Sequence, residues 1–176
     1  MPAAHSPPCP LAIVDVQYRG AGASAACVVA AAWGDAVGIE ERTAELASVE
    51  PYRPRRFFER ELPCILAVLA CVESPLSAIV IDGYVELDAQ GTAGLGGRLH
   101  QHYEGRYVVI GVAKTAYRGS AFAAPVLRGQ SARPLFVTAR GIEIDAAARL
   151  VAAMHGAHRV PTLLARADRL ARIAAG

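Results

Sequence analysis

The amino-acid sequence predicts a single mixed α/β domain, in which helices pack on a sheet of parallel and antiparallel strands. Three strand-like segments follow one another at the start of the chain with tight turns between them, which is typical of an antiparallel meander. Later segments are continuous apolar runs, as expected for strands that are buried on both faces. Apolar residues between these runs recur at helical spacing, which predicts helices that cover the sheet.

The first half of the chain is predicted to form three strands and one helix. The strands are residues 11–19, 23–33 and 36–46, and the helix covers residues 57–72. Pro63 is expected in the first turn of this helix, where a proline is tolerated. Glu61 lines up with Ile65 and Val68 at about 100° per residue, so we expect it to border the packed face.

The second half alternates strands and helices. Strands are predicted at residues 78–84, 107–115 and 134–140, and helices at 145–155 and 162–174, with a short helix after the glycine-rich stretch 91–97. This order of elements is that of the ribonuclease H-like fold, a mixed sheet flanked by helices. We expect one domain over residues 11–176, after a flexible lead-in at residues 1–10.

The composition predicts a globular protein that carries no strong overall charge. The chain has 176 residues, 53% of them hydrophobic, and a net charge of +2, so any nucleic-acid contact must come from local patches.

No apolar run is long enough to cross a bilayer, and the first ten residues do not resemble a secretion signal, so we expect a cytoplasmic protein without membrane contact. The four cysteines form no CxxC pair, which favours reduced thiols over a zinc site.

Three carboxylates lie at or near the ends of apolar segments: Asp15, Glu61 and Asp82. Lys114 ends another apolar run and is the single lysine among 18 basic residues. Alone, each residue has a structural explanation, such as an Asp–Gly turn, a helix N-terminal acid or a solvated strand end. Together they predict a site for Mg²⁺, with Mn²⁺ as the alternative, because carboxylate oxygens suit these ions and the lysine can support a phosphate or the attacking water.

A loop before the first helix combines basic and aromatic side chains. Its members are Tyr52, Arg53, Arg55, Arg56, Phe57, Phe58 and Arg60. Basic residues interleaved with aromatics suit a nucleic-acid surface, and an ordinary solvated loop explains the same pattern equally well.

These residues resemble the endonuclease V family over most of the chain, from about Leu11 to Arg172. The resemblance is carried by short motifs in a fixed order. Asp15 in VDVQY is similar to the family's first metal aspartate, the segment 51–54 (PYRP) to its PYxP wedge, and Arg60-Glu61 with Pro63 to its FRExP helix start. Residues 80–83 (VIDG) resemble its second aspartate strand, 111–114 (GVAK) its lysine strand, and 159–161 (RVP) with Ala167-Asp168 its C-terminal tail.

The resemblance implies an endonuclease that acts on a deaminated purine, hypoxanthine, in DNA or RNA. It implies catalysis by Asp15, Glu61, Asp82 and Lys114, with the three acids binding Mg²⁺. Tyr52 would be the wedge, with Pro51, Arg53 and Pro54 beside it in contact with the nucleic acid. Candidates for the pocket that accepts the base are Gly83, Leu95 and Gly111. Inosine-containing DNA or RNA is therefore the expected partner; no protein partner is inferred, and we expect a monomer.

Two departures from the family pattern leave an alternative open. The segment after Asp82 has no His-Pro pair, and the late family histidine is missing from residues 138–143, where Glu143 or Asp145 are possible substitutes as oxygen ligands. These departures motivate the alternative of a nucleic-acid-binding protein that has lost cleavage. A Rossmann-type nucleotide module is disfavoured, because the glycines at 20 and 22 lead into a strand rather than a helix.

Overall fold

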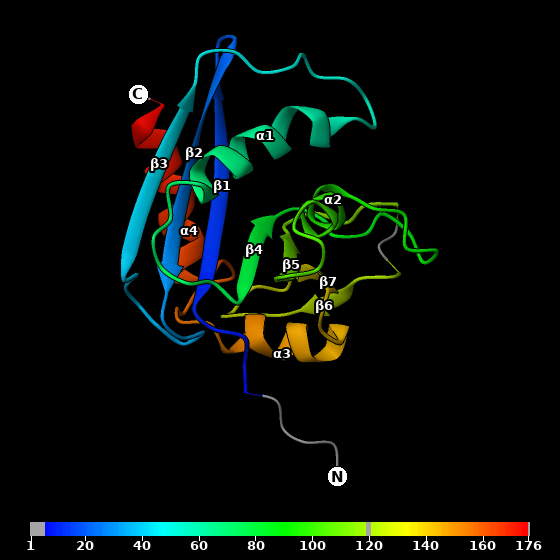
Figure 1. Cartoon of the computed structure of the whole chain (residues 1–176). Helices are drawn as coiled ribbons and strands as arrows, with labels where there is room; N and C mark the ends of the chain where they lie inside the picture. The colour runs from blue at the N-terminus through cyan, green and yellow to red at the C-terminus, as the bar shows by residue number, and fades with distance from the viewer. Residues whose placement is uncertain (1–5, 119–120, 176) are drawn as a thin grey trace.

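The computed structural model describes residues 6–118 and 121–175, and these form one mixed sheet with helices on both faces (Figure 1). The strand order within the described residues is β3-β2-β1-β4-β5-β7-β6. The strands are β1 (Leu11–Arg19), β2 (Gly22–Ala30), β3 (Glu40–Leu46), β4 (Ala78–Asp82), β5 (Val108–Ala113), β6 (Ala124–Val126) and β7 (Leu135–Arg140). The helices are α1 (Phe57–Leu69), α2 (Leu95–His102), α3 (Ile144–Ala153) and α4 (Thr162–Ala174). The prediction of a ribonuclease H-like mixed sheet is confirmed.

The sheet has an antiparallel half and a parallel centre. β1 pairs antiparallel with β2, and β2 with β3, so the predicted meander is correct. β1 also pairs in parallel with β4, and β4 in parallel with β5. The carboxyl ends of β1, β4 and β5 therefore point to the same edge of the sheet, the edge at which open α/β sheets bind ligands.

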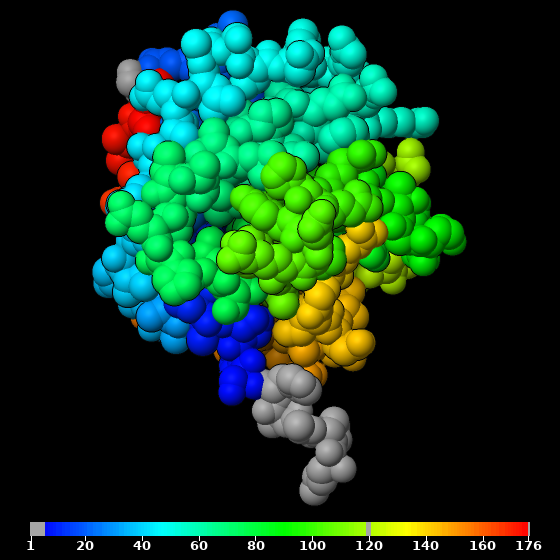
Figure 2. Space-filling view, viewed as in Figure 1, coloured from blue at the N-terminus to red at the C-terminus, as the bar shows by residue number. Residues whose placement is uncertain are grey.

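Side chains alternate between two apolar layers, one on each face of the sheet. This follows from the two-residue period of a strand. In Figure 1, α1 crosses one face of the N-terminal strands and α4 lies on the opposite face, and Figure 2 shows α1 and α2 side by side over the first face. The α3 and α4 layer includes Leu11, Ile13, Val80, Ile110, Val112, Leu163 and Ala167. The α1 and α2 layer includes Ala12, Val14, Ile65, Val68, Ile79, Ile81 and Leu99.

Several element boundaries differ from the sequence prediction. β2 ends at Ala30 rather than at residue 33. Trp33 is buried because it packs in the apolar cluster on the α3 and α4 side of the sheet, and its indole N–H donates to the carbonyl of Pro8. β3 begins at Glu40, and β6 was not predicted. Pro63 lies in the second turn of α1, since the helix already begins at Phe57, so its predicted place in the first turn is wrong.

The described residues contain no disulfide, as the cysteine spacing predicts. All four cysteines lie within the described residues and are free thiols; Cys27 and Cys64 are buried, whereas Cys9 and Cys71 are exposed. The predicted lead-in lies partly outside the described residues, which start at residue 6. Within the described part of the chain, no helix is both long and apolar enough to cross a bilayer.

Candidate active site

A cavity of about 850 Å³ opens at the carboxyl edge of the parallel strands. Its walls come from the segments after β4 and β5, the loop before α1, and the C-terminal half of α4. One side is acidic and carries Asp15, Glu61, Asp82 and Asp168, with the cations Lys114 and Arg172. The rest of the lining is largely aromatic and apolar, with Tyr52, Pro54, Phe57, Phe58, Gly83, Tyr84, Leu87, Leu95 and Tyr117. It also includes the cations Arg55 and Arg118. An acidic edge beside an aromatic wall is suited to an ion and a planar group together.

Strand alternation explains why three of the predicted residues face the same way. Asp15, Asp82 and Lys114 continue the alternating positions of β1, β4 and β5 that face α4. Glu61 comes instead from the buried side of α1, on the other face of the sheet. All four line the cavity, so the predicted catalytic residues are brought to one place.

Lys114 is held by Asp82. Its Nζ lies 2.7 Å from Oδ2 of Asp82, and both side chains are about two-fifths exposed, at 41% and 36%. Burial works against the charged lysine, but the hydrogen bond to Asp82 and the charges of Asp82, Asp15 and Asp168 outweigh it, so the pKa of Lys114 is raised. The ammonium is therefore charged and fixed beside the acidic side of the cavity.

Glu61 is a buried carboxylate with an unsatisfied oxygen. It is 5% exposed, and its Oε2 has no hydrogen-bond partner among the described residues. Burial, followed by the charges of Asp15 and Asp82, raises the pKa of Glu61 to about 8. The Tyr18 hydroxyl lies close enough to lower this pKa somewhat, yet it completes no geometrically sound hydrogen bond within the described residues.

Asp15 and Asp168 form a pair of neighbouring carboxyl groups. Burial first, and then the charge of Asp82, raises the pKa of Asp15 to about 7, while its backbone bond from Val16 opposes the shift. Asp168 bonds to Asp15, accepts a hydrogen bond from the Gln17 amide at 3.0 Å, and pairs with Arg172. Burial tends to raise the pKa of Asp168, but these bonds lower it overall, so Asp15 keeps its proton to a higher pH than Asp168 does.

The donor set fits a hard cation by its chemistry. Carboxylate oxygens are the ligands that Mg²⁺ takes in proteins, and the free Oε2 of Glu61 is an oxygen that such an ion would satisfy. Among the described residues, however, no three side chains of the metal-binding types stand close enough together to form a ready-made ligand set. Protons on Asp15 and Glu61, together with Lys114 and Arg172, balance the negative charge of the cavity instead.

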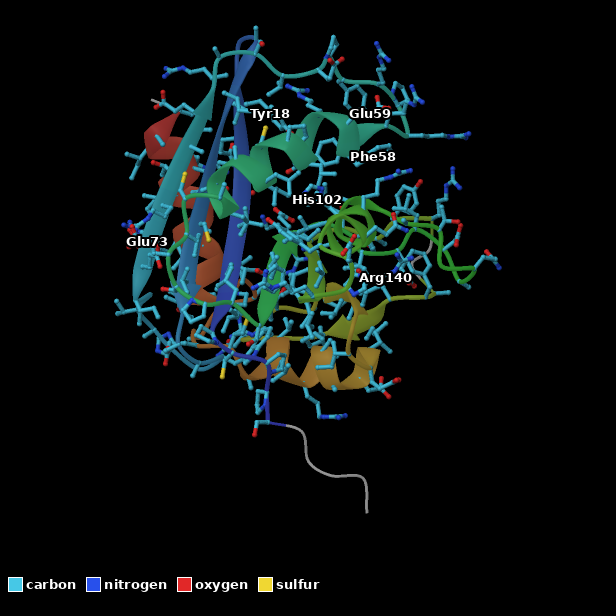
Figure 3. All side chains as sticks on the ribbon, viewed as in Figure 1. Tyr18, Phe58, Glu59, Glu73, His102 and Arg140 are labelled. Atoms are coloured by element: carbon cyan, nitrogen blue, oxygen red, sulfur yellow. The ribbon has the colours of Figure 1, made fainter. Side chains whose placement is uncertain are left out.

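The PYRP loop forms the mouth of the cavity. Tyr52 is 63% exposed and lines the cavity together with Pro54, whereas Pro51 and Arg53 are exposed outside its lining. Behind the mouth, the guanidinium of Arg98 on α2 lies 3.6 Å from the centre of the Phe58 ring, whose side chain Figure 3 labels on α1. The aromatic part of the predicted nucleic-acid surface is thus built into the cavity wall.

The three predicted base-pocket residues differ in position. Gly83 and Leu95 line the cavity, and the backbone of Gly83 has φ +130°, a conformation that favours glycine. Gly111 lies behind them in β5: a Cβ there would stand 2.4 Å from the carbonyl oxygen of Gly83 and 2.9 Å from Oγ1 of Thr138. Gly111 therefore allows the β4 and β5 segments to approach closely.

The proposed substitutes for the missing histidine are in the wrong place. β7 runs antiparallel to β5 and pairs Arg140 with Val109, so Glu143 and Asp145 follow at the opposite edge of the sheet from Lys114. Asp168 of α4 supplies the additional carboxylate instead. The Ala167-Asp168 pair in the tail motif was the sequence signal for it, but its neighbours Asp15 and Gln17 are too distant in sequence to reveal the contact.

The chain was compared with known proteins. No family profile and no curated protein matches it. Among solved structures, endonuclease V from Streptomyces avermitilis is 30% identical, with a TM-score of 0.74 over 93% of this chain and 80% of that one. An endonuclease V variant from Ciona intestinalis, in complex with a 23mer DNA containing an inosine, is 17% identical, with a TM-score of 0.80 over 94% and 84% of the two chains. Human ENDOV is 21% identical, with a TM-score of 0.75 over 94% and 83%. The cavity and its carboxylates thus lie on a fold shared with these enzymes, and the chain belongs to the endonuclease V family.

Proposed function

We propose that this protein is a metal-dependent endonuclease that hydrolyses a phosphodiester 3′ to a deaminated purine, inosine or hypoxanthine, in nucleic acid. The observation that carries the proposal is the convergence of Asp15, Glu61 and Asp82 on one cavity, where burial and mutual repulsion raise the pKa values of Asp15 and Glu61. Ionising these acids together in one cavity is costly unless a cation compensates their charge, and a metal-dependent nuclease uses such a cation.

Asp15, Glu61 and Asp82 would hold Mg²⁺ or Mn²⁺, with Asp168 beside them. The ion supplies charge neutralisation and activation of water at the scissile phosphate. Asp82 orients Lys114, whose ammonium would then face the phosphate or the attacking water. Because the ion must displace protons from Asp15 and Glu61, we expect its affinity to rise as the pH rises from about 6 to 8.

The cavity also suits the rest of the substrate. The Ciona intestinalis endonuclease V structures contain DNA with an inosine followed by a ribo-adenosine, and we propose the same class of substrate for this chain. Tyr52, exposed at the mouth, is suited to stack on a base and hold the strands apart. The aromatic and glycine-rich wall offers a flat surface for the extruded base.

The site is contained in one chain, and we propose that the protein acts as a monomer without a protein partner. Four free thiols suit a reducing compartment, which supports a cytoplasmic role in nucleic-acid repair.

The decisive experiment is cleavage of matched DNA and RNA oligonucleotides, each with one inosine, in the presence and absence of Mg²⁺. We expect cleavage 3′ to the inosine that requires the ion and is abolished in Asp82→Ala, with binding largely retained. An Asp88→Ala variant, on the nearby surface loop, is the matched control and should cleave normally. Binding without product would support the alternative of a protein that has lost cleavage, and full activity of Asp82→Ala would refute the metal assignment.

A further inference from the structure

Two cations lie on the acidic side of the cavity, and each is held by a different carboxylate. Lys114, which the sequence analysis predicts as a site residue, pairs with Asp82. Arg172 pairs with Asp168 through two hydrogen bonds, Nε to Oδ2 at 2.9 Å and Nη2 to Oδ1 at 3.1 Å. The proposed function gives Arg172 no role.

The position of Arg172 differs from that of a purely structural arginine. Its side chain is 65% exposed, and Arg172 nevertheless belongs to the lining of the cavity. It follows Asp168 by one helical turn on α4, so the two side chains lie on the same face of the helix. An exposed ion pair of this kind contributes little to folding. Arg172 can therefore exchange Asp168 for another anion at low cost.

The guanidinium is also chemically suited to the ligand of this cavity. Its planar fork binds a carboxylate in the same two-point geometry that it uses for a phosphate. Asp168 therefore presents the fork already ordered at the edge of the cavity, within the same lining as Lys114. Because Arg172 and Lys114 both line the cavity, a nucleic-acid backbone bound there is within reach of both cations.

We propose that Arg172 is a phosphate-binding residue of this cavity, which Asp168 keeps in place until a nucleic-acid backbone takes over its guanidinium. The inference rests on the proposed nuclease function and deepens it. Release from Arg172 also leaves the Asp168 carboxylate free to act with Asp15 beside it.

The same helix provides a matched control. Arg166 also lies on α4 and also forms two hydrogen bonds to one carboxylate, from Nε and Nη2 to Glu41, both at 2.8 Å. Glu41 belongs to the edge strand β3, and neither residue lines the cavity. Arg166→Ala and Arg172→Ala thus remove the same side chain and the same type of ion pair, but only one removes a cation from the cavity.

The test measures binding of a fluorescent inosine-containing duplex by anisotropy in EDTA at several salt concentrations. We expect Arg172→Ala to weaken binding about three- to tenfold and to reduce the slope of log affinity against log salt by about 1. Arg172→Lys should keep the slope but bind more weakly, because it retains the charge without the fork. Arg166→Ala should stay within about twofold of the wild type.

Steady-state cleavage gives an independent measurement. A phosphate contact made equally in the ground and transition states raises KM and leaves kcat nearly unchanged, and this is the result expected for Arg172→Ala. If Arg172→Ala matches Arg166→Ala in affinity and salt slope while the wild type cleaves, the inference is wrong and the nuclease function stands. If the wild type neither binds nor cleaves, the proposed function itself fails. Should Arg172→Ala not fold, Arg172→Gln carries the same comparison, because it also removes the positive charge and should reduce the salt slope equally.

Discussion

At the scale of single residues, the most unusual feature is a buried glutamate whose neighbouring positive charge, Arg60, does not outweigh the cost of its burial. Glu61 is 5% exposed, and its pKa is raised to about 8 by burial and by the neighbouring aspartates. A carboxyl group with a raised pKa in the folded state stabilises the fold fully below its unfolded pKa, near 4.5, and this contribution is lost as the pH rises towards 8. Without a metal ion, Glu61 is therefore a source of instability at neutral and alkaline pH.

We predict that Glu61→Gln makes the metal-free protein more stable at pH 8, by on the order of 1–3 kcal/mol, and no more stable at pH 4. Glutamine keeps the shape of the side chain but removes the charge that must be buried. The same variant should lose cleavage, because an amide is a poorer ligand for a hard cation. Thermal unfolding of the metal-free protein between pH 4 and 8 measures the change in stability, and cleavage of the inosine-containing oligonucleotide with Mg²⁺ measures the loss of activity.

Glu59→Gln is the control for this prediction. Glu59 lies two positions earlier on α1, in the first helical turn, and pairs with Arg56 at 3.3 Å on the surface. Its replacement should leave the pH dependence of stability unchanged. Equal responses of the two variants would show that burial of Glu61 does not govern the stability at alkaline pH.

At the scale of elements, the helix that presents Glu61 contains a proline in its second turn. Pro63 has no N–H to donate to the carbonyl of Glu59, and its side chain is exposed, so it gains little from packing. We predict that Pro63→Ala stabilises the protein by about 1–2 kcal/mol, measured by urea unfolding, because the restored helical hydrogen bond outweighs the greater freedom of the unfolded chain.

Pro51→Ala tests whether the effect belongs to the helix. Pro51 is exposed in the loop before α1, where a proline breaks no helical hydrogen bond. This variant should be neutral or slightly destabilising. A destabilised Pro63→Ala variant would contradict the prediction and mean that the proline is needed where it stands.

The sequence predicted most elements because their patterns are local. β1 and α4 match the predicted ranges at both ends, since their apolar periods end where the elements end. β6 was missed because it is three residues long and contains Pro125, which lowers strand propensity but is tolerated on the edge of a sheet. The excess length predicted for β2 has a tertiary cause, because Trp33 is buried by packing in the apolar cluster on the α3 and α4 side rather than by strand pairing.

The candidate site could be predicted only in part, because only some of its residues stand out in a local sequence pattern. Asp15, Asp82 and Lys114 end or interrupt apolar strands, so their chemistry stands out locally. Asp168 lies on an amphipathic helix among arginines, where an acid looks like an ordinary helical ion-pair partner. Its role depends on the packing of α4 against β1, which no local pattern reveals.

At the scale of the whole molecule, one buried arginine joins the segment after β6 to the connection between α3 and α4. Arg128 is 6% exposed, and its guanidinium donates to the carbonyls of Met154, Gly156, His158 and Arg159. This connection leads directly into α4, so Arg128 fixes where that helix begins. The position of Asp168 against Asp15 depends on it.

We predict that Arg128→Ala lowers the free energy of unfolding by about 2–4 kcal/mol, because several buried carbonyls lose a charged donor at once. Urea unfolding monitored by circular dichroism measures the change. Arg149→Ala, at an exposed position on α3, should change stability by less than about 0.5 kcal/mol. An equally small loss for Arg128→Ala would mean that water replaces its hydrogen bonds.

The bond from Gln17 to Asp168 joins positions 151 residues apart. Since α4 follows the other described elements in the chain, all strands of the sheet have been synthesised before Asp168 can take its place in the cavity. For the nuclease activity proposed above, this order means that Asp168 is the last of the cavity's carboxylates to reach its place, and it does so when the first strand and the last helix meet.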